Sequence, residues 1–312
     1  MIRFNEIGGL PPCIMTLPTR RPELLQSRYP MQVEASQLVI VDWSAGHALD
    51  LPGRRWDYVL HGAATADPIQ FMRDPDRSLR DTISTAASIA NIARASTAKR
   101  LVLISSGAVY GDQPGDLPEI PETFRGAPDI SALTSGYGEA KRVSELLFRL
   151  SGVDQRVARV FSVIGPYQDL ASHFAVPDLI RQAAEHGFLQ LTSDGSGRRS
   201  FCYASDLTIC LVKLLVGEVR HDVYNVGCRE GTASVAEVAN MLADIFGGLE
   251  VRPTSKSPEQ ANYVPQLDRL YETYAPRVGL REALLRTCHS LFARGLIDRQ
   301  PVVQLELPAP GS

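Results

Sequence analysis

The stretch LVLISSGAVYG at residues 101–111 decides the fold of this chain, because an apolar run ends abruptly at two hydroxyls and a glycine. Its first four residues are all aliphatic, so both faces of a strand there would be apolar. This predicts a strand at 101–105 that is buried between two layers. Ser106 follows at the carboxyl end of this strand, where ligands bind in open parallel sheets. The stretch therefore predicts a parallel α/β sheet with polar groups at a ligand site.

A second stretch, SGYGEAK at residues 135–141, places Tyr137 and Lys141 four residues apart at the start of a predicted helix. Residues at this spacing lie on one face of a helix. A free tyrosine has a pKa of about 10 and is a poor base at neutral pH, but a neighbouring ammonium group favours the phenolate. On its own this pattern is common by chance. After a strand that ends at Ser106, it predicts a proton-transfer site.

Short apolar runs alternate with longer segments of helical period up to about residue 165, which predicts a parallel sheet covered by helices on both faces. We predict a core domain at 1–165, a mainly substrate-binding region at 166–298 with some elements returning to the core, and a flexible tail at 299–312. The predicted strands lie at 38–41, 58–60, 101–105, 157–162, 188–192 and 223–226, and the predicted helices at 78–95, 138–150, 176–185, 206–216, 234–246 and 280–294.

The composition is that of an ordinary globular protein, with 44% hydrophobic and 21% charged residues. A net charge of −3 gives no basic excess, so neither nucleic acid nor an anionic membrane is an expected partner. The five cysteines are scattered without any C-x-x-C pair, which argues against a disulfide framework and against a metal site. No apolar run reaches about 18 residues and no signal peptide is recognisable. We expect a soluble, cytoplasmic protein with a small-molecule ligand.

Four further blocks occur in the order expected of one family. YVLHGAA at 58–64 resembles V-I-H-L-A-A, RVFSVIGP at 159–166 resembles R-x-F-N-V-Y-G-P, DGSGRRSFCY at 194–203 resembles G-D-G-x-x-x-R-x-F-x-Y, and VYNVG at 223–227 resembles Y-N-V-G. With the serine, tyrosine and lysine, they resemble the extended short-chain dehydrogenase/reductases of the NAD-dependent epimerase/dehydratase family. The resemblance covers roughly residues 14–290.

This resemblance implies a Rossmann-like doubly wound sheet and an enzyme that transfers a hydride at a ring carbon of a nucleotide sugar, as in surface polysaccharide biosynthesis. It implies NAD or NADP as the cofactor and a homodimer as the assembly. Tyr137 would be the acid/base, Lys141 would lower its pKa and hold the nicotinamide ribose, and Ser106 would hydrogen-bond the reacting oxygen. The implied cofactor-binding residues are Gly62, Ala63, Ala64, Thr82, Tyr137, Lys141 and Phe161, and the implied substrate-binding residues are Ser162, His173 and Arg199. An arginine such as Arg199 suits the diphosphate.

The sequence departs from the family at its start. The family opens with a strand and G-x-x-G-x-x-G, whose backbone amides hold the cofactor pyrophosphate, but here the only early cluster is Gly8-Gly9, with two prolines behind it. The stretch 13–22 resembles the family's second strand instead, so the first β-α unit is apparently absent. Either a longer enzyme has been truncated, or the cradle is lost and the cofactor binds weakly or not at all. Arg20 and Arg21 would favour the 2′-phosphate of NADP, although arginines after a strand are also ordinary.

A second departure bears on the reaction. Family 4,6-dehydratases have an Asp-Glu pair, and decarboxylases a Ser-Glu pair, where this chain has Gly107 and Ala108. An epimerase-type reaction is therefore the first hypothesis. The alternatives are a 4,6-dehydratase or decarboxylase, an NADP-dependent carbonyl reductase, and a cofactorless binding subunit. The sugar, the nucleotide and the net reaction are left open.

The remaining polar side chains have simpler interpretations. We expect His61 to be a packed histidine and Cys202 to lie in the core, while Glu139 and Glu145 are expected on solvated helix faces. The apolar helix positions could form a dimer contact or pack against the sheet; they are Leu79, Ile83, Ala86, Val143, Leu146 and Leu147.

Overall fold

The computed structural model describes residues 13–34, 38–43, 55–64, 68–172, 174–254 and 262–305. The chain divides into two compact units, residues 1–54 and residues 55–312. The first unit contains β1 (Met15–Thr19) and β2 (Leu38–Asp42), which pair in parallel. Two short helices lie between them, α2 (Pro22–Arg28) and α3 (Pro30–Glu34). The predicted strand at 38–41 is confirmed, and Gly8-Gly9 lies outside the described residues.

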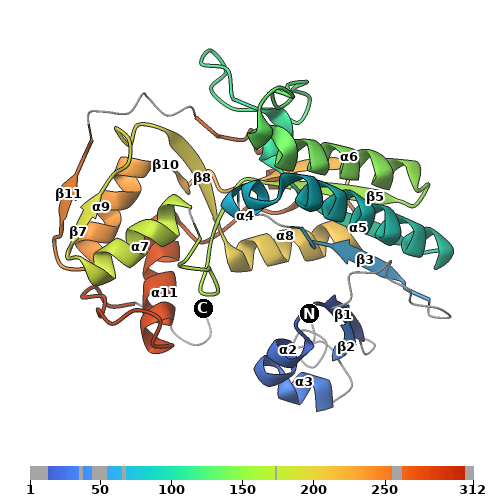
Figure 1. Cartoon of the computed structure of the whole chain (residues 1–312), viewed down its shortest axis with the longest axis horizontal. Helices are drawn as coiled ribbons and strands as arrows, with labels where there is room; N and C mark the ends of the chain where they lie inside the picture. The colour runs from blue at the N-terminus through green and yellow to red at the C-terminus, as the bar shows by residue number, and fades with distance from the viewer. Residues whose placement is uncertain are drawn as a thin grey trace. The chain divides into compact units, whose positions relative to one another are not determined.

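The second unit is built on a parallel sheet of order β3-β4-β5-β9, which confirms the predicted α/β class. These strands are β3 (Tyr58–His61), β4 (Arg100–Ser106), β5 (Gln155–Val160) and β9 (Val223–Val226). Leu101 and Leu103 of β4 pack with α5 (Pro75–Ala95) and α6 (Gly136–Leu150), while Val102 packs with α8 (Ala204–Val216). Figure 1 shows α5 and α6 side by side over the sheet. Because helices cover both faces of β4, its residues Leu101–Ile104 are all aliphatic.

The described strands of the two units form separate sheets, β1-β2 in the first unit and β3-β4-β5-β9 in the second. In the Rossmann strand order 3-2-1-4-5-6, the first strand lies between the second and the fourth. The β1-β2 pair corresponds to strands two and three, and β3 to strand four. Within the described ranges no strand joins β1 to β3.

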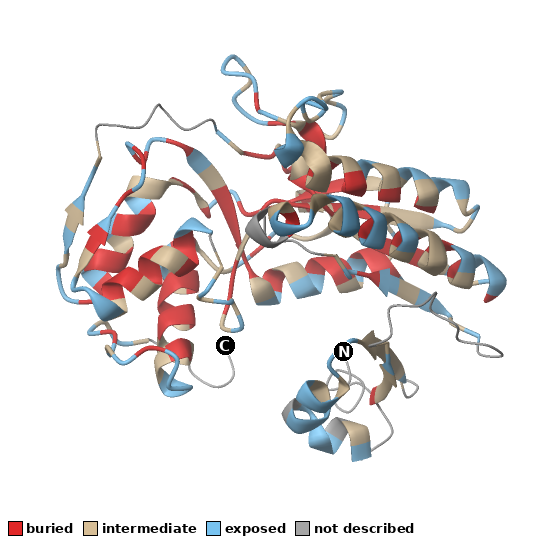
Figure 2. Cartoon of the chain, in the orientation of Figure 1, coloured by how far each residue is buried: buried red, intermediate tan, exposed pale blue. Residues whose placement is uncertain are grey.

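The C-terminal region has its own core, which Figure 2 shows as buried faces on converging helices. The helices α7 (Ala175–Glu185), α9 (Val235–Ile245) and α11 (Leu280–Ala293) share one apolar cluster. The strands β6 (Ser162–Ile164), β8 (Arg198–Tyr203) and β10 (Thr232–Ser234) form a small sheet, and β7 (Phe188–Gln190) pairs with β11 (Glu250–Arg252). The short α4 (Pro68–Arg73) precedes α5, and α10 (Asp268–Thr273) follows β11.

One strand prediction is corrected. The run 157–162 is not one strand, because β5 ends at Val160 and β6 begins at Ser162 in a different sheet. The Phe161 amide still donates to the carbonyl of Val226 in β9. After Phe161 the chain leaves β9, and β6 pairs with β8 instead. The tail begins in an ordered way, since the Val302 amide donates to the Ile245 carbonyl over 2.9 Å.

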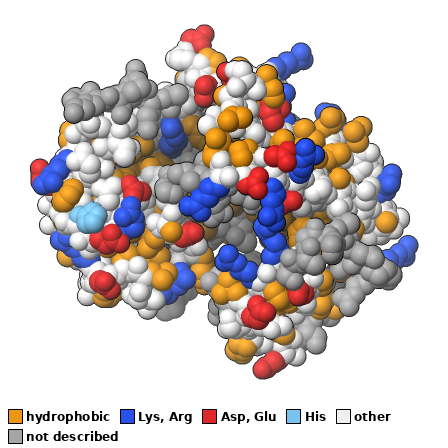
Figure 3. Space-filling model, viewed as in Figure 1, with side chains coloured by type: hydrophobic (Ala, Val, Ile, Leu, Met, Phe, Trp, Pro, Cys, Tyr) orange, Lys and Arg blue, Asp and Glu red, His pale blue; other side chains and the backbone are white. Residues whose placement is uncertain are grey.

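Two surface observations complete the fold. Basic and acidic side chains are interspersed on the face drawn in Figure 3. Among the helices within the described ranges, none is long and apolar enough to cross a membrane.

Candidate active site

Ser106 is placed by the end of β4. It caps the short 3-10 turn at Gly107–Tyr110, and its hydroxyl accepts a hydrogen bond from the Ala108 amide over 3.2 Å. The side chain is buried. The strand end and the turn together hold the Ser106 hydroxyl in one place.

Tyr137 and Lys141 lie one turn apart on α6, on the side that packs against β4. Gly138 permits this approach, because a Cβ there would lie 2.6 Å from the Ala108 carbonyl oxygen. The Tyr137 phenol hydrogen-bonds with Ser106, and the Lys141 ammonium lies 6.0 Å from the centre of the Tyr137 ring. The structure therefore brings the three predicted catalytic residues together.

The pKa values of Tyr137 and Lys141 differ from what a direct contact between the two side chains would give. Burial raises the pKa of Tyr137, and the hydrogen bond with Ser106 partly offsets it. Burial lowers the pKa of Lys141 to about 8, although Glu145 opposes that change. The Lys141 ammonium donates to the Ile104 carbonyl over 2.8 Å instead of contacting the phenol oxygen. Ser106 is thus the direct polar partner of Tyr137.

A residue that sequence reasoning missed completes this cluster. Tyr263 hydrogen-bonds with Ser106, and its ring packs on Phe161 with centroids 4.4 Å apart. A Cβ built on Gly107 would lie 2.4 Å from the Tyr263 hydroxyl oxygen. No local pattern marks Tyr263, because it reaches the site from a segment far along the chain.

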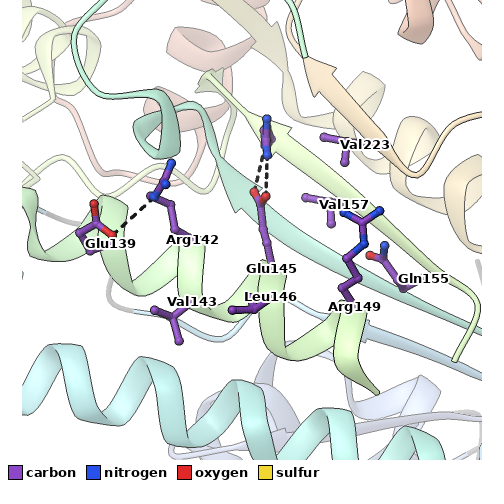
Figure 4. Close-up of a pocket in the computed structure, with 10 residues that line it drawn as sticks. Glu139, Arg142, Val143, Glu145, Leu146, Arg149, Gln155, Val157 and Val223 are labelled. Carbon is purple, nitrogen blue, oxygen red and sulfur yellow. Dashed lines mark hydrogen bonds and ion pairs between the residues drawn. The ribbon is translucent and has the colours of Figure 1, made fainter. Parts of the chain in front are cut away.

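Glu145 is not on a solvated helix face, so that prediction is wrong. It lies two turns beyond Tyr137 on the same side of α6 and forms a two-point ion pair with Arg159 of β5, at 3.0 and 2.6 Å. Ser105 also donates to it over 2.6 Å. Figure 4 shows Glu145 pointing from α6 toward the sheet, where it lines a pocket of about 470 Å³. The spacing of 137, 141 and 145 could have revealed this inward face. Glu139, by contrast, pairs with Arg142 nearer the surface.

His61 and Cys202 are the core residues that the sequence predicted. His61 is 4% exposed and packs on Phe148, and burial lowers its pKa to about 4, with Lys141 acting in the same direction. Cys202 is fully buried, and burial raises the pKa of its thiol. A thiol with a raised pKa is a poor nucleophile.

The implied cofactor-binding residues of the second unit have different surroundings. Gly62 and Ala63 are exposed and Ala64 is half-buried at the carboxyl end of β3. Thr82 is buried and its hydroxyl donates to the Ser78 carbonyl in its own helix. Phe161 is a core residue beside Tyr263.

The implied substrate-binding residues are partly described. Ser162 is half-buried at the start of β6, and Arg199 is half-buried in β8 with its guanidinium 6.0 Å from the Tyr263 ring centre. Burial lowers the pKa of Arg199, and Tyr263 opposes this. His173 lies outside the described residues. Arg20 and Arg21 are exposed after β1 in the first unit.

The residues fit one end of a nicotinamide cofactor. Lys141 is 4% exposed and uses one of its three donors on the Ile104 carbonyl. The other donors remain for a ribose hydroxyl near Tyr137. At the pyrophosphate end, β1 is followed by Arg20, Arg21 and Pro22, and the described part of the chain contains no glycine-rich turn from a strand to a helix.

Other kinds of site find no support in the described ranges. No group of three or more His, Cys, Asp or Glu side chains there is arranged to hold a metal ion. None of Ser106, Tyr137 and Lys141 lines the pocket of Figure 4.

Known proteins share this architecture. UDP-glucuronic acid decarboxylase 5 of Arabidopsis thaliana is 29% identical over 236 residues, which are 73% of this chain and 68% of that protein. An NAD-dependent NDP-hexosamine 5,6-dehydratase of tunicamycin biosynthesis matches with a TM-score of 0.74 and 20% identity, over 94% of this chain and 93% of that chain. A UDP-glucuronic acid 4-epimerase variant from Bacillus cereus matches with a TM-score of 0.71 and 20% identity, over 90% of this chain and 91% of that one. Residues 16–227, about two thirds of the chain, match the NAD dependent epimerase/dehydratase family. The chain is thus an enzyme of the NAD-dependent epimerase/dehydratase family, with NAD or NADP as its cofactor.

Proposed function

We propose that this enzyme converts a UDP-activated sugar by oxidising a ring hydroxyl and reducing the ring again, with Tyr137 as the acid/base. The observation that carries the proposal is the hydrogen bond between Ser106 and Tyr137 above the buried Lys141, at the carboxyl end of β4. Similarity to UDP-glucuronic acid decarboxylases supports a UDP-sugar as the substrate class. Surface polysaccharide biosynthesis is a use that suits such a product.

The residues divide the proton chemistry among them. The Ser106 hydroxyl binds the reacting sugar oxygen and orients it toward Tyr137. Tyr137 acts as a phenolate: it takes the proton of the sugar hydroxyl, becomes a neutral phenol, and later returns that proton to the carbonyl oxygen. Lys141 supplies positive charge beneath the phenol and donors for a ribose. Bound NAD or NADP would accept and return the hydride. Arg199, half-buried beside Tyr263, would hold the diphosphate.

The lack of a carboxyl after Ser106 narrows the net reaction. Gly107 and Ala108 carry no acid, so loss of water would need a proton donor from elsewhere. Epimerisation needs no such donor. Decarboxylation of a hexuronic acid is the second candidate, because the curated relatives that are 29% identical are UDP-glucuronic acid decarboxylases.

Incubation with UDP-glucuronic acid and NAD or NADP separates these reactions. We expect a product of unchanged mass, an isomer of the substrate, in catalytic excess over the enzyme. Product that has lost carbon dioxide would establish the second candidate instead. If UDP-glucuronic acid, UDP-glucose and UDP-N-acetylglucosamine all remain unchanged with either cofactor, the proposed function is wrong.

We further propose a cytoplasmic homodimer that joins through α5 and α6. Leu146 and Leu150, one turn apart on α6, are 55% and 72% exposed, so this helix presents neighbouring leucines to solvent. Leu146→Glu is expected to convert a dimer to a monomer in sedimentation velocity. The control, Leu133→Glu, changes a leucine outside these helices that is 73% exposed and should leave the dimer intact. A wild-type monomer would contradict the proposal.

A further inference from the structure

We propose that Tyr263 is a positioning residue of the acid/base site, whose phenol donates to the Ser106 hydroxyl and thereby directs the Ser106 proton toward Tyr137. The inference rests on the proposed function only for the role of Tyr137 in turnover. The hydrogen-bond order itself can be tested on the protein without substrate.

The surrounding chain holds Tyr263 firmly. Its amide donates to the Arg198 carbonyl over 2.9 Å, so the segment is tied to β8. The next amide, of Val264, donates to the Gln113 side chain over 2.8 Å on the opposite side. Because its ring packs at a tilt against the Phe161 ring, Tyr263 has little freedom to turn away.

Gly107 makes room for the Tyr263 hydroxyl. A Cβ at position 107 would lie 2.4 Å from the Tyr263 hydroxyl oxygen and 2.8 Å from the tip of the Phe161 ring. Both distances are far below van der Waals contact. The space that a side chain at position 107 would occupy is therefore filled by the phenol of Tyr263. Tyr263, far from Gly107 in the sequence, thus places its hydroxyl where position 107 has no side chain.

The hydrogen-bonding capacity of Ser106 sets the direction of the network. A serine hydroxyl has one proton and two lone pairs. The Ala108 amide already occupies one lone pair, and Tyr137 and Tyr263 share what remains. In the protein without substrate an ionised Tyr137 can only accept, so Ser106 must donate to Tyr137 and accept from Tyr263. When substrate binds, the same Ser106 proton points at the reacting sugar oxygen, which then lies between Ser106 and Tyr137. Burial raises the pKa of Tyr263, which keeps its phenol protonated and able to donate.

Several other groups influence these two phenols. From α6, Lys141 lies near Tyr137, and Lys141 itself is influenced by Glu145. From β8, Arg199 lowers the pKa of Tyr263, whereas Tyr137 and Tyr110 act to raise it. The change from tyrosine to phenylalanine at position 263 leaves all of these groups in place, so it isolates the hydroxyl.

Tyr263→Phe tests the proposal through the titration of Tyr137. Isotope-labelled tyrosine, observed by NMR from neutral to strongly alkaline pH, reports each phenol directly, and the spectrum of Tyr137→Phe identifies the Tyr137 signal. We expect the pKa of Tyr137 to be about one unit higher in Tyr263→Phe. Without the Tyr263 hydroxyl, Ser106 is no longer held with its proton toward Tyr137, so the Tyr137 phenolate is less well stabilised. The control, Tyr271→Phe, removes a hydroxyl that donates to Glu230 outside the site and should leave Tyr137 unchanged. An unchanged Tyr137 titration in Tyr263→Phe would overturn the proposal.

Two further measurements separate positioning from packing. With a substrate that the enzyme turns over, Tyr263→Phe should lower kcat about tenfold at neutral pH, leave KM unchanged, and regain activity as the pH rises. A fall in activity that is equal at every pH would show a structural role and refute the inference. Gly107→Ala should displace the Tyr263 hydroxyl and reproduce the alkaline shift of Tyr137, whereas a normal titration in this variant would contradict the contact. Because the NMR titration needs neither substrate nor cofactor, failure of the proposed function leaves its result readable.

Discussion

Tyr137→Phe is expected to lower turnover by roughly two to four orders of magnitude, the usual contribution of a positioned acid/base group. Phenylalanine keeps the ring that packs edge-on against Phe71 at 6.1 Å, so the fold should be unaffected. It removes the oxygen that hydrogen-bonds with Ser106 and that would exchange the substrate proton. Steady-state kinetics should show the loss in kcat, while calorimetric titration with the UDP-sugar should give a similar Kd.

The comparison variant is Tyr58→Phe, which removes the hydroxyl of a partly exposed tyrosine in β3 and should keep wild-type turnover. Turnover of Tyr137→Phe within a few fold of the wild type would remove Tyr137 from the mechanism. Parallel loss of sugar binding would instead assign Tyr137 to substrate binding.

Glu145→Ala is expected to lower the free energy of unfolding by about 3 kcal/mol, because it leaves the guanidinium of Arg159 without its charged partner. The two side chains are only 14% and 15% exposed, and they meet through two hydrogen bonds. Burial lowers the pKa of Arg159, but the hydrogen bonds and charge of Glu145 outweigh it and raise the pKa overall. Without Glu145 the guanidinium of Arg159 still keeps its charge, because an arginine side chain stays protonated at neutral pH. Urea denaturation would measure the change.

The matched control is Asp76→Ala, which breaks the pair between Asp76 and Arg80 on the surface of α5. Both of those side chains are more than 70% exposed, so the expected cost is about 0–1 kcal/mol. If Glu145→Ala proves no less stable than Asp76→Ala, the pair between α6 and β5 does not contribute as its burial indicates. Glu145→Gln, which keeps the shape and loses the charge, should fall between the two.

Local patterns predicted much of this protein. The aliphatic run at 101–104 predicted β4, since a strand covered on both faces is apolar at successive positions. The helical period placed α6 and predicted that Tyr137 and Lys141 share a face. The strand predicted at 157–162 was wrong because a change of sheet at Phe161 depends on what lies beside the chain. Glu145 was misassigned for the same reason, since its partner Arg159 belongs to another element.

The sequence by itself determined the α/β class, the family and the placing of Ser106, Tyr137 and Lys141, because these depend on periodicity and on spacings within short stretches. The direct polar partners were decided only by the tertiary structure. Lys141 donates to a carbonyl of β4, Glu145 meets Arg159, and Tyr263 fills the space beside Gly107. Each of these contacts joins residues from separate elements, so it exists only after the sheet, α6 and the C-terminal segment have packed together. The residues next to a side chain in the sequence do not predict such a contact. The hydrogen bonding of Ser106 therefore depends on Tyr263, which no local motif identifies.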